Sequence, residues 1–179
     1  MAIDEKETLT GDAALAKIRR LLKDLPIAFM VTVDGGGVLA RPIGVVGGHG
    51  AFDGSLWFIT DRRSRKVAAI QQGATTALLF QNDREGTYLH LSGRAEVVED
   101  RDRLKALYTP VQRTWFPDGV DDPHITLLRF DATDASYWDG HASMLRLATA
   151  FAKSLVTGAP GASGNAGIAE LPAESREPD

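Results

Sequence analysis

The pattern of apolar and polar residues predicts one N-terminal helix followed by a series of short strands. Apolar side chains recur at helical spacing over residues 12–25, where Asp12 is placed to cap the helix and Pro26 to end it. After Pro26 come short segments rich in β-branched and aromatic residues, separated by turns of Gly, Asn and Asp. These segments predict strands over residues 27–33, 38–46, 55–60, 75–80, 87–98, 125–132 and 135–138.

The connections between the strands favour a small antiparallel β-barrel of about six strands, mainly β with flanking α. Most strands follow one another through tight turns and not through the helical crossovers of β-α-β units. Gly93 interrupts the longest strand, as the bulge or bend at a barrel corner requires. So small a barrel is filled by its own side chains, so we expect a ligand on its outside or at a subunit junction. Short helices are expected at the margins, starting at Ser64 and covering 100–108 and 143–155.

Length and composition favour one soluble domain. We expect it over residues 1–157, with residues 158–179, rich in Gly, Ala, Ser, Pro and Glu, as a disordered tail. The N-terminus is charged and is not a signal peptide, and no apolar run approaches the roughly 20 residues that span a bilayer. The expected protein is cytoplasmic and has no membrane partner.

Charge and residue types exclude several kinds of function. The net charge of −4 argues against nucleic acid as a partner, because nucleic-acid modules normally carry a basic excess. The sequence has no cysteine, which excludes disulfides, thiolate metal sites and cysteine nucleophiles. The four histidines form no close pair, so we expect no metal site. No residue stands out as a catalytic acid or base, and an anionic ligand would have to be captured by a local basic cluster.

Such a cluster follows the strand that ends at Thr60. A hydroxyl and several cations at the start of a helix, where backbone N–H groups are free, form a phosphate site in miniature. Arg41, on the neighbouring strand, could reach the same place across the sheet. The alternative is a solvated basic surface with a simple helix cap. The residues of the cluster are Arg62, Arg63, Ser64, Arg65 and Lys66.

Two tryptophans stand in positions that suit contact with a flat ligand. Trp115 falls in the irregular segment 109–122, and Trp138 ends the last predicted strand. Their rings offer an apolar face with a polar edge, which serves a ligand ring or a subunit interface equally well. For Trp57, inside a predicted strand, packing is the better interpretation.

Residues 56–67 resemble the phosphate-binding segment of the pyridoxamine 5′-phosphate oxidase-like split-barrel flavoproteins. Further matches follow in order at residues 91–98, 115–119, 122–123 and 137–139, and the last group resembles the general stress protein branch of that superfamily. The resemblance implies a six-stranded split barrel that forms a homodimer with FMN at the subunit interface. By position it implies that Trp138, and also Trp115, reach FMN from the partner subunit. It implies that the FMN contacts of the first subunit are Arg41, Ile59, Thr60, Ser64, Arg65 and Lys66.

The sequence also departs from the oxidases of this superfamily. Met144 and Arg146 stand where those enzymes have the Arg and His that grip the substrate phosphate, and Tyr88 stands where they have a glutamine. Vitamin B6 oxidation is therefore not expected. The leading hypothesis is an FMN-dependent oxidoreductase that uses a small-molecule electron donor or acceptor. The alternatives are a flavin-binding stress protein without turnover, or a deazaflavin or haem binder, and FAD is not distinguished from FMN.

Overall fold

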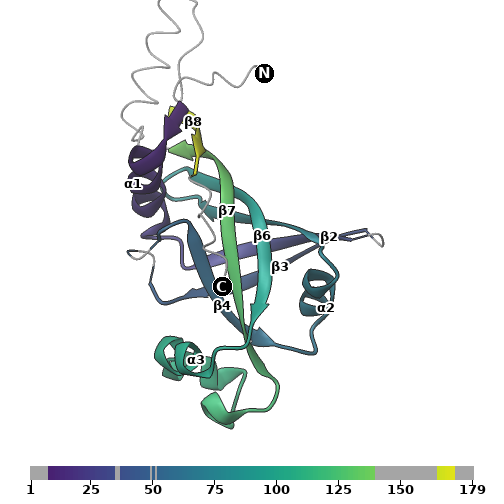
Figure 1. Cartoon of the computed structure of the whole chain (residues 1–179). Helices are drawn as coiled ribbons and strands as arrows, with labels where there is room; N and C mark the ends of the chain where they lie inside the picture. Colours follow the sequence, from purple (N-terminus) through teal and green to yellow (C-terminus); the bar gives the residue numbers. More distant parts are fainter. Residues whose placement is uncertain (1–7, 35–36, 49, 51, 140–164, 172–179) are drawn as a thin grey trace, which may run out of the picture.

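Six antiparallel strands close into a barrel in the computed structural model, which describes residues 8–34, 37–48, 50, 52–139 and 165–171 (Figure 1). The strands follow one another around the barrel in the order β7-β4-β3-β2-β5-β6, and β6 returns to β7. The prediction of a mainly β, six-stranded antiparallel barrel is confirmed. The strands are β2 (Ile27–Asp34), β3 (Gly37–Val46), β4 (Ser55–Asp61), β5 (Thr75–Asn82), β6 (Thr87–Val98) and β7 (Ile125–Asp139).

Strand β7 is one continuous element, so the prediction of two strands with a break before Ala135 was wrong. Its first half pairs with β4, and β6 pairs with it along almost its whole length. Because β6 supplies hydrogen-bond partners on both sides of the Thr133 region, the polar residues there do not end the strand. The ladder bends in a single place, between Ser92 and Gly93, where its register shifts.

Gly93 makes this bend possible, as predicted. A Cβ atom built at this position would lie 2.1 Å from the carbonyl oxygen of Asp131, so no side chain fits. The two long strands therefore approach more closely here than side chains allow. The bend lets β6 and β7 curl across the barrel and close it.

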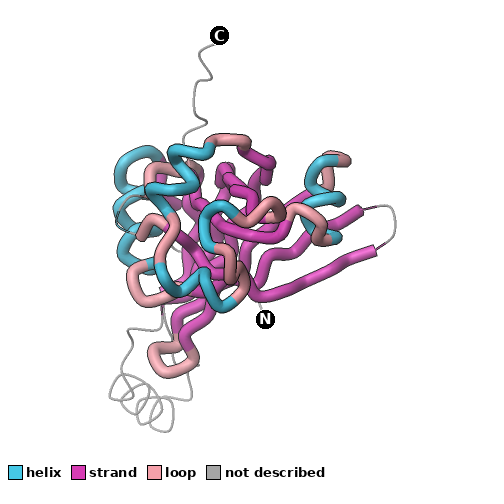
Figure 2. Tube along the Cα trace, turned by 90° about the horizontal axis from the view of Figure 1, so that it is seen from below, coloured by secondary structure: helices cyan, strands magenta, loops and turns pink. Residues whose placement is uncertain are grey.

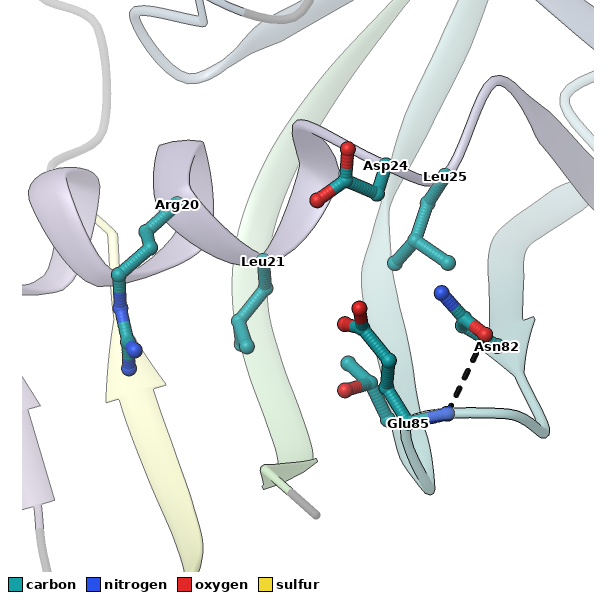
Figure 3. Close-up of a pocket in the computed structure, with 7 residues that line it drawn as sticks. Arg20, Leu21, Asp24, Leu25, Asn82 and Glu85 are labelled. Atoms are coloured by element: carbon teal, nitrogen blue, oxygen red, sulfur yellow. Dashed lines mark hydrogen bonds between the residues drawn. The ribbon is translucent and has the colours of Figure 1, made fainter. Parts of the chain in front are cut away.

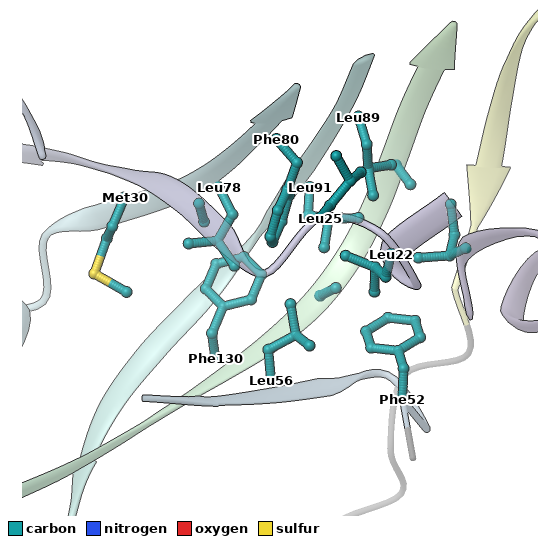
Figure 4. Close-up of a cluster of buried hydrophobic side chains, with 14 of the residues drawn as sticks. Leu22, Leu25, Met30, Phe52, Leu56, Leu78, Phe80, Leu89, Leu91 and Phe130 are labelled. Carbon is teal, nitrogen blue, oxygen red and sulfur yellow. The ribbon is translucent and has the colours of Figure 1, made fainter. Parts of the chain in front are cut away.

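The barrel interior holds the main core, which continues under helix α1 (Gly11–Leu22) (Figure 4). Ile18 and Leu22 lie on the apolar face of the helix, which packs against Phe52 and the barrel core. The helix ends three residues earlier than predicted and starts one residue earlier, and Thr10, not Asp12, occupies its N-cap position. Asp12 lies in the first turn, where its charge is favourable to the helix dipole.

A second, smaller core lies outside β4 and is covered by helix α3 (Arg101–Leu107) and two 3₁₀ helices, η2 (Pro110–Thr114) and η3 (Gly119–Asp121). Asp100 caps α3, as its side chain accepts a 2.8 Å hydrogen bond from the backbone N–H of Arg103. Trp57 packs against this core, and the Arg103 guanidinium lies over its ring, 4.1 Å from the ring centroid. The packing interpretation of Trp57 is confirmed.

The C-terminal part of the chain returns to the sheet. Strand β8 (Asn165–Glu170) pairs antiparallel with the last six residues of β7 and parallel with β1 (Thr8–Thr10). The prediction of disorder for residues 158–179 was therefore wrong at β8, whose Ala169 is buried. The helix predicted over 143–155 lies outside the described residues. None of the helices described in the chain is long and apolar enough to cross a membrane.

Candidate functional site

The turn between β4 and helix α2 (Arg65–Gln71) carries the basic cluster at one end of the barrel (Figures 1 and 2). Two of its four cations are paired with carboxylates. Arg63 lies 2.7 Å from Asp61, and Arg62 lies 3.3 Å from Glu99. The side-chain hydrogen bond from Arg63 lowers the pKa of the Asp61 carboxyl to about 2. These two arginines therefore have carboxylate partners of their own and are not the best candidates to hold an external anion.

Of the other two cations, Lys66 lies near Arg41 of β3, and Arg65 precedes it in the chain. Within the described residues, no carboxylate forms an ion pair with Arg41, Arg65 or Lys66. Lys66 is half-buried, and this burial together with the nearby charge of Arg41 lowers the pKa of its ammonium group. Two cations that repel each other in a partly desolvated place favour a bound anion, because the anion offsets both costs.

Ser64 directly precedes Arg65 and Lys66 in the chain. Its hydroxyl is buried without a hydrogen-bond partner in the described part of the protein. It occupies the N-cap position of α2, but its side chain makes no capping hydrogen bond. The prediction that a short helix starts at Ser64 is confirmed, but the hydroxyl does not take part in the cap. A buried hydroxyl without a partner costs about 1–3 kcal/mol, so this oxygen needs a group that is not part of the described chain.

We call Arg41, Ser64, Arg65 and Lys66 the basic corner. Arg41 is held in place by β3, where it pairs with Met30 of β2, and its guanidinium donates to the Thr32 hydroxyl at 3.5 Å. Helix α2 packs against β2 and β6, which fixes Ser64 and Lys66 relative to the barrel. Uncompensated guanidinium and ammonium groups beside a free hydroxyl are the donor set that phosphate oxygens accept. The residues present therefore fit a phosphate-bearing cofactor.

Ile59 and Thr60 precede the basic corner on β4 and face opposite sides of the sheet. Thr60 is buried on the barrel side, and Ile59 packs against the second core. A ligand that follows this edge would therefore meet Ile59 through its backbone and not through its side chain. Both residues stay predicted cofactor contacts.

The structure does not bring Trp138 to the basic corner of the same copy. Trp138 lies near the opposite end of the 15-residue strand β7 from Ile125, which pairs with Asp61 beside the corner (Figure 1). Trp115 lies in the turn after η2 and is 68% exposed. In one copy of the chain, Trp138 and the basic corner therefore cannot contact the same cofactor.

Tyr88 is the neighbour of Trp138 that sequence reasoning did not place there. The two residues are directly opposite on β6 and β7, and both are well exposed, Tyr88 at 43% and Trp138 at 38%. The hydroxyl of Tyr88 donates to Asp83 at 3.2 Å, and this hydrogen bond raises the pKa of the phenol. Only the register across the bulge reveals the pair. The pair places two exposed aromatic side chains next to each other on the same face of the sheet.

This aromatic pair belongs to a broad apolar surface that we call the outer sheet face. Phe29 pairs with Leu79, which pairs with His90 in turn, so these residues lie in one row across three strands. The ring nitrogens of His90 lie 3.4 Å from the hydroxyls of Ser92 and Ser136. The large exposed apolar residues of the face are Ile27, Phe29, Val33, Val38, Leu79, Tyr88 and Trp138.

A small pocket lies apart from these residues, between the end of α1 and the turn that joins β5 to β6 (Figure 3). The pocket is large enough for one water molecule and too small for a flavin ring. Among the described residues, no three His, Asp or Glu side chains gather as a metal site would require. The pocket is lined by Arg20, Leu21, Asp24, Leu25, Asn82, Glu85 and Thr87.

A sequence model of the family described as pyridoxamine 5′-phosphate oxidase like matches residues 13–160. The chain belongs to this family. Protein bli-3 of Neurospora crassa is 26% identical over 113 residues, and the match spans 59% of this chain and 54% of that protein. The chain thus covers about half the length of this curated relative. The comparison confirms the resemblance on which the family prediction was based.

Solved structures of the same fold support this membership. A general stress protein 26 from Jannaschia sp. CCS1 has a TM-score of 0.71 at 22% identity, over 87% of this chain and 96% of that one. The general stress FMN/FAD binding protein from Xanthomonas citri has a TM-score of 0.60 at 25% identity, over 72% of this chain and 90% of that one. These two structures share the fold of this chain, and the second of them is named as an FMN/FAD binding protein.

Proposed function

We propose that this chain binds FMN and holds its phosphate at the basic corner. The observation that carries the proposal is the buried, unpartnered hydroxyl of Ser64 beside Arg41 and Lys66, two cations without a carboxylate partner in the described chain. A phosphate dianion would complete the hydrogen bonding of the hydroxyl and offset the repulsion between the cations. A neighbour named as an FMN/FAD binding protein supports the choice of a flavin.

The ring of the flavin is held by a second copy of the chain in this proposal. Trp138 and Tyr88 lie far along the barrel from the basic corner of their own copy, so they serve the cofactor of a partner. The outer sheet face around them is apolar, as a subunit interface requires, and it carries Phe29 and Leu79 in one row. The functional unit is then a homodimer with two flavin sites, each completed by both copies. Trp115, which is exposed on the turn after η2, is a further contact across the interface.

The proposed activity is that of an FMN-dependent oxidoreductase with a small-molecule electron donor and acceptor. The flavin supplies the hydride chemistry, and the chain binds the cofactor, orients its ring and excludes water from one of its faces. Arg41, Arg65 and Lys66 hold the phosphate end, and the edge of β4 at Thr60 lies beside it. The role of the described residues is therefore positional, and no proton transfer is assigned to any of them.

A titration with three related compounds tests the binding proposal. FMN, riboflavin and FAD are each added to the purified protein, and affinity is measured from quenching of flavin fluorescence. We expect FMN to bind at least about 100-fold more tightly than riboflavin, because the phosphate contacts are worth about 3 kcal/mol or more. Equal affinities for FMN and riboflavin would show that the basic corner does not hold the phosphate.

Reduction of the bound flavin separates an enzyme from a binding protein. NADH or NADPH is added in air, and the absorbance of the bound flavin at about 450 nm is followed over time. Steady consumption of the nicotinamide supports the oxidoreductase. A flavin that binds but stays oxidised with both donors supports the alternative, a stress protein that sequesters or senses FMN.

A further inference from the structure

We propose that Asp139 is a positioning residue for Trp138, an inference that rests on the proposed function because it takes Trp138 as a contact of the flavin ring. Trp138 lies on β7 between Tyr137 and Asp139, and consecutive side chains of a strand point to opposite faces. Tyr137 and Asp139 are buried, at 1% and 5% exposed, while Trp138 lies on the outer sheet face. The orientation of the tryptophan is therefore set by the two buried residues next to it.

Helix α1 holds both of these neighbours. Lys17 Nζ lies 2.7 Å and an Arg20 guanidinium nitrogen 2.5 Å from the same carboxylate oxygen of Asp139. Lys17 Nζ also lies over the ring of Tyr137, 4.7 Å from the ring centroid. Figure 3 shows the Arg20 side chain extending from α1 toward β8, the strand that pairs with this end of β7. We call Lys17, Arg20 and Asp139 the α1 clamp.

The chemistry of the clamp favours a role in geometry over a role in stability. A buried ion pair gains little net stability over apolar side chains of similar volume, because both charges lose their hydration. What it does provide is one defined arrangement, since the carboxylate accepts charge-assisted hydrogen bonds only at short range. Asp139 is buried in the clamp and Lys17 is largely so, at 5% and 12% exposed, while Arg20 reaches the same carboxylate from the surface. In the ion pair of Arg101 with Asp121, by contrast, both side chains are exposed. The clamp thus places a buried carboxylate with two cationic partners directly beside a residue of the proposed ring site.

The clamp also fixes the register of the strand end. Because side chains alternate, a slip of one residue would bury Trp138 and expose Asp139. Asp139 can meet Lys17 and Arg20 only from the inner side of the sheet, so the clamp selects the register in which Trp138 faces outward beside Tyr88.

A double-mutant cycle on FMN affinity tests the proposal. We expect Asp139→Asn to weaken FMN binding about fivefold in the wild-type background, because a displaced ring loses most of an aromatic contact. In a Trp138→Ala background we expect the same change to have no further effect, since the residue that it positions is absent. A purely structural role would lower the melting temperature in both backgrounds and would give additive effects on affinity, which would overturn the proposal.

Two further variants keep the test decisive. Lys17→Met leaves the contact of Arg20 with Asp139 in place, so this variant should remain folded even if Asp139→Asn does not. It should weaken FMN binding less than Asp139→Asn does, and again only where Trp138 is present. Asp121→Asn removes the carboxylate of the exposed pair with Arg101 and should leave FMN affinity unchanged. All affinities are measured below the temperature at which circular dichroism shows unfolding.

The outcomes separate this inference from the proposed function. If Trp138→Ala leaves FMN affinity unchanged, both the ring contact and the positioning role of Asp139 are wrong. Binding at the basic corner is then judged separately, from the comparison of FMN with riboflavin. If FMN does not bind to the wild-type protein at all, the proposed function itself is wrong.

Discussion

Arg41 on β3 and Lys66 on α2 lie close enough for the charge of Arg41 to contribute, after burial, to the lowered pKa of Lys66. They belong to elements separated by β4 in the chain, and the barrel brings them to the same corner. The nearby carboxylate of Asp61 acts on Lys66 in the opposite sense, but its ion pair is with Arg63. The pair of cations is unfavourable to the free protein and favourable to a complex with an anion. Removing one of the two charges should therefore have opposite effects on the stability of the free protein and on its affinity for FMN.

Lys66→Met should stabilise the free protein and weaken its binding of FMN. A lysine whose pKa is lowered by folding holds its proton less tightly in the folded state than in the unfolded state. Its charge therefore opposes folding at neutral pH, and the penalty disappears as pH rises past the unfolded value of 10.5. We expect the variant to melt about 1–2 °C higher at pH 7, with a difference that shrinks toward pH 10.5. Thermal unfolding at the two pH values measures it, and a lower melting temperature at pH 7 would contradict the account of Lys66.

Ser64→Ala should cost affinity for FMN without costing stability. The hydroxyl makes no capping hydrogen bond and has no partner in the described chain, so the usual N-cap loss of about 1 kcal/mol should be missing. Loss of a hydrogen bond to a charged phosphate should weaken FMN binding by about 1.5–3 kcal/mol. Urea unfolding and FMN titration measure the two quantities.

The matched control for Ser64→Ala is Asp100→Ala. Asp100 does cap its helix through its side chain, at 2.8 Å from the N–H of Arg103. We expect this control to lose about 1 kcal/mol of stability and to keep its FMN affinity. If Ser64→Ala behaves like Asp100→Ala, the serine is a structural cap and not part of the phosphate site.

Asp61 should make the stability of the protein depend on acid pH. Its pKa is lowered by Arg63 from 3.8 to about 2, so its contribution is complete above pH 3.8 and is lost as pH falls through about 2. The pair is substantially exposed, which limits the effect to below about 1 kcal/mol. We expect Asp61→Asn to show a smaller drop in unfolding free energy between pH 5 and pH 2 than the wild type. Identical drops in both proteins would show that the ion pair with Arg63 does not stabilise the fold.

Phe29→Asp should prevent self-association and weaken FMN binding together. Phe29 lies on the outer sheet face, is 44% exposed and pairs with Leu79, so a charge there would be buried in a dimer. We expect a monomer by sedimentation and a loss of FMN affinity of about tenfold or more, because each flavin loses its contacts with the partner. A variant that is monomeric and still binds FMN normally would show that one copy makes a complete site.

Local signals in the sequence were enough to predict the barrel and the basic corner. The strand that ends at Asp61 and the cations after it are adjacent in the chain, so their arrangement depends on one turn. Gly93 was predictable for a similar reason, since a glycine inside a long strand has few uses other than a bend or a close approach. These features need no knowledge of distant partners.

Features that depend on distant pairing could not be predicted. The segment 165–170 consists mostly of small residues and has little strand propensity of its own, and it forms β8 because β7 and β1 lie on either side of it. The same is true of Tyr88, whose position opposite Trp138 depends on the register shift before Gly93. Ser64 was placed correctly at the start of a helix, but whether its hydroxyl caps that helix depends on how the turn packs.

Strand β7 has one further consequence if the dimer forms as proposed. Ile125, at its start, lies beside the basic corner, and Trp138 lies near its end. One strand therefore links the proposed phosphate site of one flavin to the proposed ring contact of the other. Each copy would then contribute to both flavin sites of the assembly through the same strand. A substitution that shifts the register of β7 would therefore disturb both sites at once.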